Sequence, residues 1–457
     1  MTRTRARRPS ADATLTPLRR LLKQSPADAT SLALVTSRQR TIRFAFGRVH
    51  QDLFQQTSTL YAKVAVKGRV GVSVMHTGDA TLWRAALRQA RDIADVTPQL
   101  PGGVHVPEPQ PCPRLHTHSA ATATVTPAQY LARLQQLMQL AQGCGAQLAG
   151  SLVIADDALG VASSTGIALH QPSTVAALKL IAIGPACSGY ASHVVRDITA
   201  LDWEGCLERA LTKCLTRATP RDLPVGKYQV LLEPDAVAEL LTWLGYLGFG
   251  AKQFAERTSF LCGRMGDRIT GEAITITDDG LDPSTLSTPF DYEGVPKRRV
   301  ALIERGVAAG LVYDTHYGRL YDVPSTGHAP TPDGNEGPLP SHLSLAAGAS
   351  TRDAMVRAMT RGVLVTRFHY VNGFLDPRNT LMTGLTRDGT FLVEDGKLIA
   401  PVRNLRFTER IFEAFARARM ISRDRQLIAD PAQDSGGMLV PALLIDDFTF
   451  TGTSEDA

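Results

Sequence analysis

The chain has 457 residues, 44% of them hydrophobic and 20% charged, which is enough apolar material for a sizeable core and excludes disorder of the whole. The formal net charge is +5, but the first 23 residues alone carry +6 and the rest is close to neutral at −1. A near-neutral body has no spread of positive potential to hold a phosphate backbone, so dedicated nucleic-acid binding is disfavoured.

The basic residues 1–25 are expected to form a disordered tail, and residues 26–222 a layered α/β domain. Alternation of apolar and polar residues predicts strands, and helical spacing predicts helices. Thr126 as N-cap followed by Pro127 is a typical helix start. The expected strands are 31–36, 41–46, 60–66, 151–155, 166–170 and 175–183. The expected helices are 79–95, 127–141 and 201–217, with a proline-rich connection over 97–113.

A linker at residues 221–227 places the main domain boundary, and residues 223–453 are expected to form a β-rich domain with frequent Asp-Gly turns. A strand at 228–232 precedes a helix at 234–247. That helix carries a buried stripe consisting of Val237, Leu240, Leu241, Leu244 and Leu247. Two more helices are predicted near 351–361 and 407–420. The fold class is therefore α+β with two domains.

Glu233 and Asp235 open the helix at this boundary. One interpretation is a pair of carboxylates beside a cleft. The preferred interpretation is that acids in a first helical turn complement the helix dipole and its free N–H groups.

A polar set lies within residues 314–328. It consists of Asp314, His316, Tyr317, Tyr321, Asp322 and His328. Its nitrogen and oxygen atoms suit a divalent cation or a small acid–base site. Hairpin and turn residues have the same composition without either role, and that interpretation is preferred.

The six cysteines form no C-x-x-C pair, which favours free thiols in a reducing compartment. No apolar run reaches the roughly 18 residues of a membrane span. No apolar stretch follows the Arg7-Arg8 pair, so a secretory or twin-arginine signal is not expected. We expect a cytoplasmic protein that does not bind a membrane.

Several ordered blocks in the second half resemble the TldD/PmbA (TldE) family, which is viewed as a two-subunit metallopeptidase. Residues 291–329 follow that family's order of a D-x-E-G turn, a short hairpin and an S-T-G turn. Residues 343–365 resemble its strand, glycine and helix block, and 371–384 its N-G and Thr-Gly features. The resemblance extends weakly into the first half, which implies a two-domain TldD/PmbA-like fold.

The chain departs from the family at the zinc site. TldD-type subunits carry H-E-x-x-x-H on the helix that begins the C-terminal domain, and a cysteine near the C-terminus completes the ligands. By the resemblance, Thr242 and Leu247 replace the histidines, Trp243 replaces the glutamate and Ser435 replaces the cysteine. Zinc needs N and S ligands around an open position for water, so no metal and no catalytic residue is expected in this chain.

The resemblance therefore implies a TldE (PmbA)-type subunit that pairs with a zinc-bearing TldD-like subunit as a heterodimer. The pair would take part in proteolysis or maturation of unfolded or modified peptides, with zinc on the partner. The alternative is a metal-independent binding or biosynthetic protein of the same fold, acting as a homodimer. The polar set at 314–328 is the feature that supports this alternative.

Overall fold

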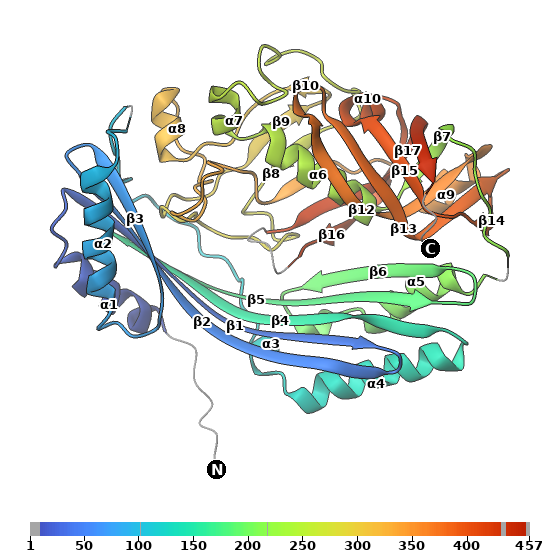
Figure 1. Ribbon diagram of the computed structural model, residues 1–457, viewed down its shortest axis with the longest axis horizontal. Coiled ribbons are helices and arrows are strands. Elements are labelled where there is room, and N and C mark those ends of the chain that lie inside the picture. The colour runs from blue at the N-terminus through green and yellow to red at the C-terminus, as the bar shows by residue number, and fades with distance from the viewer. Residues whose placement is uncertain (1–9, 101, 217, 431–435, 454–457) are drawn as a thin grey trace.

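The structure is a computed structural model that describes residues 10–453 except 101, 217 and 431–435. Two halves, each built on one sheet, lie against each other (Figure 1). This confirms the predicted α+β fold of two domains. No helix in the described ranges is both long and apolar enough to cross a membrane.

The first half contains a six-stranded antiparallel sheet in the order β3-β2-β1-β4-β5-β6. Its strands are β1 (Ala29–Ala45), β2 (Arg48–Val66), β3 (Arg69–His76), β4 (Gln147–Ser163), β5 (Ala168–Ile183) and β6 (Ser188–Val195). Its helices are α1 (Ala11–Leu22), α2 (Trp83–Val96), α3 (Ala120–Thr124), α4 (Pro127–Gly143) and α5 (Trp203–Cys214), with the short turn η1 (Ile198–Ala200).

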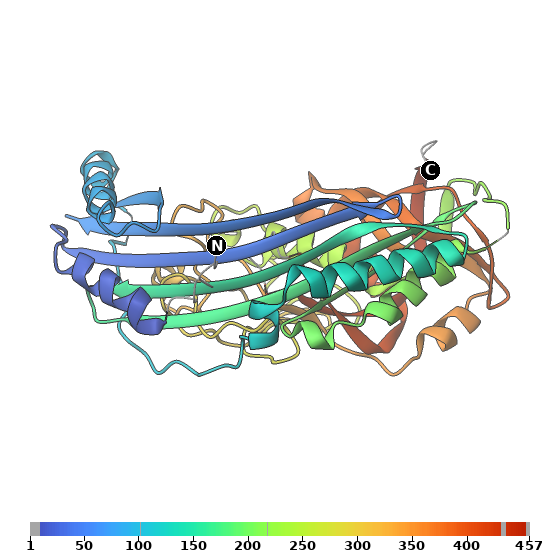
Figure 2. The same ribbon diagram turned by 90° about the horizontal axis from the view of Figure 1, so that it is seen from below.

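The two faces of this sheet have different coverings, as the alternation of side chains in a strand requires. Leu32, Ile42 and Phe44 of β1 point to the face that packs against the helices. Ala33 points the other way and belongs to a buried cluster that includes Phe290 of the second half. The result is three layers, with helices below the long curved sheet and the second half above it (Figures 1 and 2).

The second half contains an eleven-stranded sheet whose path ends in β17–β15–β13–β12–β7. Because β7 also pairs with β17, this part of the sheet closes on itself. Its strands are β7 (Gly226–Leu232), β8 (Ile276–Asp278), β9 (Val300–Glu304), β10 (Val307–Ala308), β11 (Leu343–Leu345), β12 (Arg361–Asp376), β13 (Leu381–Glu394), β14 (Lys397–Pro401), β15 (Leu405–Arg410), β16 (Ala418–Ile428) and β17 (Met438–Thr453).

The helices of the second half are short except for α6, which packs on β12 and β17. They are α6 (Pro234–Gly248), α7 (Ala251–Ala255), α8 (Thr315–Leu320), α9 (Arg352–Arg357) and α10 (Ile411–Ala416), with η2 (Pro377–Asn379). The leucine stripe predicted for α6 is confirmed, since Leu240, Leu241 and Leu244 are fully buried. Burying each such side chain stabilises the fold by about 1.5–3 kcal/mol.

Several expectations differ from the structure. The strands expected at 166–170 and 175–183 are the single strand β5, and the helices expected at 201–217 and 351–361 are the shorter α5 and α9. Residues 11–22 are not part of a disordered tail but form α1, because Leu15, Leu18 and Leu21 lie on one face and are buried against the sheet. The strands expected at 31–36 and 41–46 are one strand, since its polar middle is paired on both sides by β2 and β4. The helix expected at 407–420 shrinks to α10. Phe407 and Glu409 are buried and the residues between and after them are less so, an alternation that is typical of a strand. Residues 407–410 therefore belong to β15, and the helix begins only at Ile411.

Candidate functional site

The far end of α6 carries three of the four positions of the zinc site that the resemblance implies, two for histidine ligands and one for the glutamate. The hydroxyl of Thr242 lies 2.9 Å from the carbonyl oxygen of Ala238 and 3.3 Å from Sδ of Met438, at the start of β17. Leu247 is buried, with only 4% of its surface exposed. Ser435 lies outside the described residues.

Trp243 belongs to a set of three nearly perpendicular aromatic rings. Its ring centroid is 5.2 Å from that of Phe374 on β12 and 6.4 Å from that of Tyr246. A Cβ atom added at Gly373 would lie 2.7 Å from Trp243 Cε3 and 2.9 Å from Leu247 Cδ1. Glycine is therefore needed at this position for β12 to approach α6 so closely.

These side chains do not fit a zinc ion. Zinc in proteins is held by imidazole, thiolate or carboxylate groups, and Trp243 and Leu247 offer none of them. Thr242 has its hydroxyl beside a carbonyl oxygen and a thioether. In the part of the chain that the structure describes, no group of three or more His, Cys, Asp or Glu residues is placed to hold a metal. The end of α6 instead presents aromatic surface, with Phe374 58% exposed.

The polar set predicted at 314–328 is divided by the fold. Asp314 is the N-cap of α8, and its Oδ1 accepts a hydrogen bond of 2.7 Å from the backbone N–H of Tyr317. Burial, together with the negative charge of Glu293, raises the pKa of Asp314 to about 6. Burial and the positive charge of Lys63 lower the pKa of the neighbouring His316.

His328 lies in a different environment. Its Nε2 is 2.7 Å from Oδ1 of Asp278, and both side chains are fully buried. Burial lowers the pKa of His328. The other oxygen of Asp278 accepts hydrogen bonds from the backbone N–H groups of Ser341 and His342, each at 2.7 Å. This carboxylate therefore fixes the chain before β11 rather than facing Asp314.

The remaining members of the set have separate contacts. Tyr321 packs edge-on against Phe254 and Tyr313, with centroids 6.1 Å apart in each case. Asp322 has a φ of 53°, in the left-handed region that Asp tolerates in turns. The ring of Tyr317 contacts that of His316. Asp314, His316 and Tyr317 thus stay together on α8, whereas His328 is engaged with Asp278 and Asp322 is exposed in a turn, so the six residues do not form one acid–base site.

Apart from Glu233 and Asp235, the charged residues at the junction, where the two halves meet, were missed by the sequence reasoning. Lys63 on β2 points away from the helices and reaches Glu293 of the D-x-E-G turn, with Nζ 2.9 Å from Oε1. Burial is the largest single influence and opposes the charge on Glu293, but Lys63 and the hydrogen bonds from Thr315 together outweigh it and lower the pKa of that carboxyl. A lysine on one face of a strand gives no sign of a partner 230 positions away.

Glu233 forms the second ion-pair set of the junction. Its carboxylate accepts hydrogen bonds from Nζ of Lys213 on α5, at 2.6 Å, and from Nε of Arg352 on α9, at 2.8 Å. Burial disfavours the charged carboxylate, but the two cations together lower the pKa of Glu233 to about 2. Asp235 accepts a hydrogen bond from Ser192 at 2.9 Å. The carboxylates therefore contact side chains across the junction. Glu233 precedes α6 without a side-chain hydrogen bond to its free N–H groups, while Asp235 lies in the first turn as expected.

An antiparallel sheet that is covered by helices on one side and by a partly closed second sheet on the other defines a two-domain α+β protein. Residues 225–452 match the family model of the PmbA/TldA metallopeptidase C-terminal domain. The chain belongs to the TldD/PmbA family.

Relatives and a solved structure agree with this assignment. The chain is 26% identical over 257 residues to a metalloprotease TldD homolog of Haemophilus influenzae, covering 54% of this chain and 53% of that one. It is 26% identical over 218 residues to metalloprotease PmbA of Escherichia coli O157:H7, covering 47% and 44%. These matches span about half the length of the curated relatives. The crystal structure of TldE from Thermococcus kodakarensis has the same fold, with a TM-score of 0.87, 21% identity and coverage of 95% of this chain and 100% of that one.

Proposed function

We propose that this chain is a non-catalytic TldE/PmbA-type subunit that pairs with a zinc-bearing TldD-like subunit in a peptidase for unfolded or modified peptides. The observation that carries the proposal is the end of α6. There Trp243 and Leu247 are packed against Gly373, and Thr242 is engaged with Ala238 and Met438. A family position suited to metal ligands is thus filled by groups that cannot replace them.

The first test measures metal and activity in the purified chain. We expect less than one zinc ion per protomer by elemental mass spectrometry and no cleavage of unfolded peptides. A zinc-bearing relative with intact H-E-x-x-x-H, prepared in the same way, is the positive control. Stoichiometric zinc together with chelator-sensitive cleavage by this chain alone would refute the non-catalytic role.

The second test is co-expression with a TldD-like subunit of the same source, followed by native mass measurement. A one-to-one complex whose peptidase activity needs both chains is expected. If the chain remains a homodimer and leaves the activity of the zinc subunit unchanged, the pairing is wrong.

A homodimer with metal-independent activity is the second candidate, and one observation favours it. Asp314 is a buried carboxyl whose pKa is raised to about 6, close to the range in which general acids and bases work. The separation of the six polar residues weighs against this candidate. It predicts a homodimer in the native mass measurement whether or not a TldD-like chain is present.

A further inference from the structure

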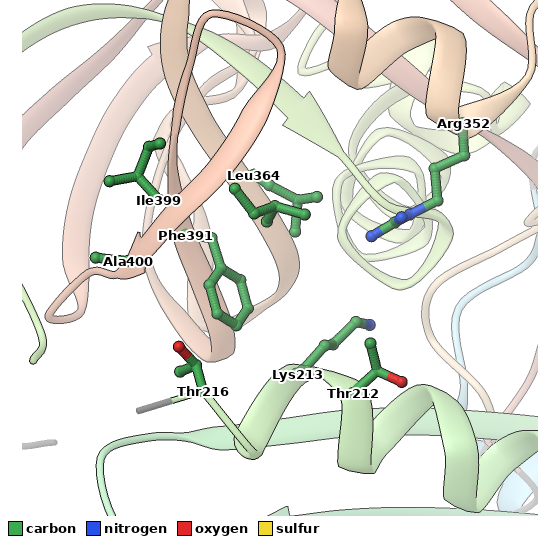
Figure 3. A pocket seen from close by; sticks show the side chains of 9 residues that line it. Thr212, Lys213, Thr216, Arg352, Leu364, Phe391, Ile399 and Ala400 are labelled. Atoms are coloured by element: carbon green, nitrogen blue, oxygen red, sulfur yellow. The ribbon is translucent and has the colours of Figure 1, made fainter. Parts of the chain in front are cut away.

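A cavity of about 150 Å³ lies at the junction between α5 of the first half and strands β12–β14 of the second. Figure 3 shows Thr212 and Lys213 rising from α5 on one side, and Arg352 reaching toward them from α9. The other walls are apolar and consist of Leu364, Phe391, Leu398, Ile399 and Ala400, with Thr216 at one end.

The charges that face this cavity are positive. Lys213 and Arg352 line it, whereas Glu233, the carboxylate that they share, does not. None of the nine described residues that line the cavity is acidic. Two cations that share one carboxylate leave one positive charge in this three-residue set. The cavity therefore favours an anion.

Arg352 has hydrogen-bonding capacity left for such an anion. It uses Nε for Glu233 at 2.8 Å, and its Nη1 lies 4.0 Å from the exposed Asp353. No shorter ion pair of its terminal nitrogens occurs in the described part of the chain. Its side chain is 43% exposed, so it lies at the mouth of the cavity. A planar guanidinium in this position suits a carboxylate.

Other carboxylates near the junction are already engaged. Asp235 accepts a hydrogen bond from the hydroxyl of Ser192, and Asp388 is paired with Arg367. Neither lines the cavity. They do not supply the missing negative charge at the mouth.

The apolar walls limit the size of the group that enters. Leu364 and Phe391 are buried, and an apolar cavity of about 150 Å³ is large enough for one benzene-sized group. The matching ligand is thus a carboxylate joined to a single apolar side chain. A free amino acid fits this chemistry less well, because its ammonium group would face Lys213 and Arg352 with no acidic residue in the lining.

We propose that this cavity binds the C-terminal residue of a peptide, with its carboxylate on Arg352 and Lys213 and an apolar side chain against Leu364 and Phe391. The inference rests on the proposed function and adds to it a binding site for the peptide terminus on the non-catalytic subunit. The preceding residues would leave through the exposed mouth beside Arg352. Because Lys213 and Arg352 belong to different halves, the bound carboxylate would also hold the halves together.

The test uses the purified full chain and the peptide N-acetyl-Ala-Ala-Ala-Leu with a free C-terminal carboxylate, followed by calorimetry and NMR. We expect a dissociation constant on the order of 1 mM or below. The same peptide with a C-terminal amide should bind at least about tenfold more weakly, because a charge-assisted hydrogen bond is lost. Free leucine should also bind more weakly than the acetylated acid.

Two variants locate the site. Arg352→Gln should abolish the preference for acid over amide, while Arg357→Gln, the same change on the exposed face of α9, should not. Since Arg352→Gln also loosens Glu233, a second variant leaves that ion pair intact. Thr212→Glu, on an exposed helical position, places a competing carboxylate at the cavity and should abolish binding, whereas Thr212→Gln should retain it.

Equal binding of acid and amide, or binding that survives both Arg352→Gln and Thr212→Glu, would overturn this proposal. So would tighter binding of free leucine, which would make the cavity an amino-acid site. The absence of binding to any of these probes would likewise overturn it. None of these results bears on zinc content or on pairing, so failure of the cavity and failure of the proposed function are distinguishable.

Discussion

The two ends of α6 have opposite chemistry. At its start, Glu233 is a buried carboxylate held by Lys213 and Arg352, and it joins the two halves of the molecule. At its other end, the uncharged side chains of Trp243 and Leu247 pack against Gly373 of β12, and Glu239 one turn earlier is hydrogen-bonded to Trp243. The end of α6 at which the resemblance implies metal ligands thus presents packed aromatic and apolar side chains, and the ion-paired end belongs to the junction.

This difference separates two uses of one helix. Charged side chains lie where the two halves meet and where the cavity opens, while the other end of α6 depends on close packing. We therefore expect the two ends to respond differently to substitution. Loss of charge should be costly at the start of α6, and gain of volume should be costly at its end.

The largest effect is expected at Glu233. Glu233→Gln would leave Lys213 and Arg352 facing a neutral amide in a buried position, and breaking one side of a buried ion pair costs about 3–5 kcal/mol. Urea unfolding at pH 7 would measure this loss. The matched control Asp353→Asn, at a side chain that is 76% exposed, should change stability by less than about 0.5 kcal/mol. Equal losses of stability in the two variants would show that the buried ion pairs of Glu233 do not stabilise the start of α6.

The pH dependence of the same residue gives a second measurement. The pKa of Glu233 in the folded chain is lowered to about 2, below the unfolded value of about 4.3. Its contribution to stability is therefore fully present well above pH 4.3 and is lost as the pH falls toward 2. The stability difference between the wild type and Glu233→Gln should shrink over that range. A difference that stays constant from pH 6 to 3 would contradict the assigned ion pairs.

A smaller loss is expected at the packed end. Gly373→Ala places a Cβ atom 2.7 Å from Trp243 Cε3, and relief of such a contact costs about 1–3 kcal/mol. Near-ultraviolet circular dichroism should report the displaced indole, and urea unfolding the loss of stability. Gly143→Ala is the control, because no atom lies within 4 Å of the added Cβ at the end of α4. A tolerated Gly373→Ala would mean that β12 and α6 separate easily.

The smallest effect is expected at Asp314, with the opposite sign. Its pKa in the folded chain is raised to about 6, above the unfolded value of about 3.9, so folding binds a proton between these values. Stability from this group is present below pH 3.9 and is lost as the pH rises through 6. Asp314→Asn keeps an N-cap and removes the charge, so it should stabilise the chain at pH 8 by about 1–2 kcal/mol and have little effect at pH 4.

Asp322→Asn is the control for this experiment. Asp322 is exposed, and Asn tolerates the same left-handed backbone conformation. Unfolding in urea at both pH values should show no gain for this variant. A gain at pH 8 that is equal for both substitutions would show that the buried position of Asp314 is not its cause.

The parts of the fold that follow from short-range spacing could be predicted. The leucine stripe of α6 and the Thr126–Pro127 start of α4 were both correct, because each depends on residues within one helix. Helix α1 was not predicted because the basic residues of this segment indicated a disordered tail. Its apolar residues Leu15, Leu18 and Leu21 nevertheless form a buried stripe at helical spacing. The linker at 221–227 indicated two domains, and the family resemblance implied the same fold, whereas periodicity alone does not specify how the strands pair.

The candidate site was less accessible to prediction. Lys213, Glu233 and Arg352 come from three elements, and the contact between Glu233 and Arg352 joins residues 119 positions apart. Nothing local marks them as partners. The polar set at 314–328 shows the reverse error, since residues close in sequence point in different directions once α8 begins at Thr315.

The position of β17 has a consequence for how the chain folds as it is made. This strand is the last of the described strands to be synthesised, yet it pairs with β7, β11, β15 and β16. The second sheet therefore closes only after β17 has been synthesised. Until then, the strand edges that pair with β17 are unpaired. Long-range pairing of this kind slows folding and exposes unpaired strands to aggregation. Premature termination before β17 should leave the first half folded and the second half a target for chaperones and proteases.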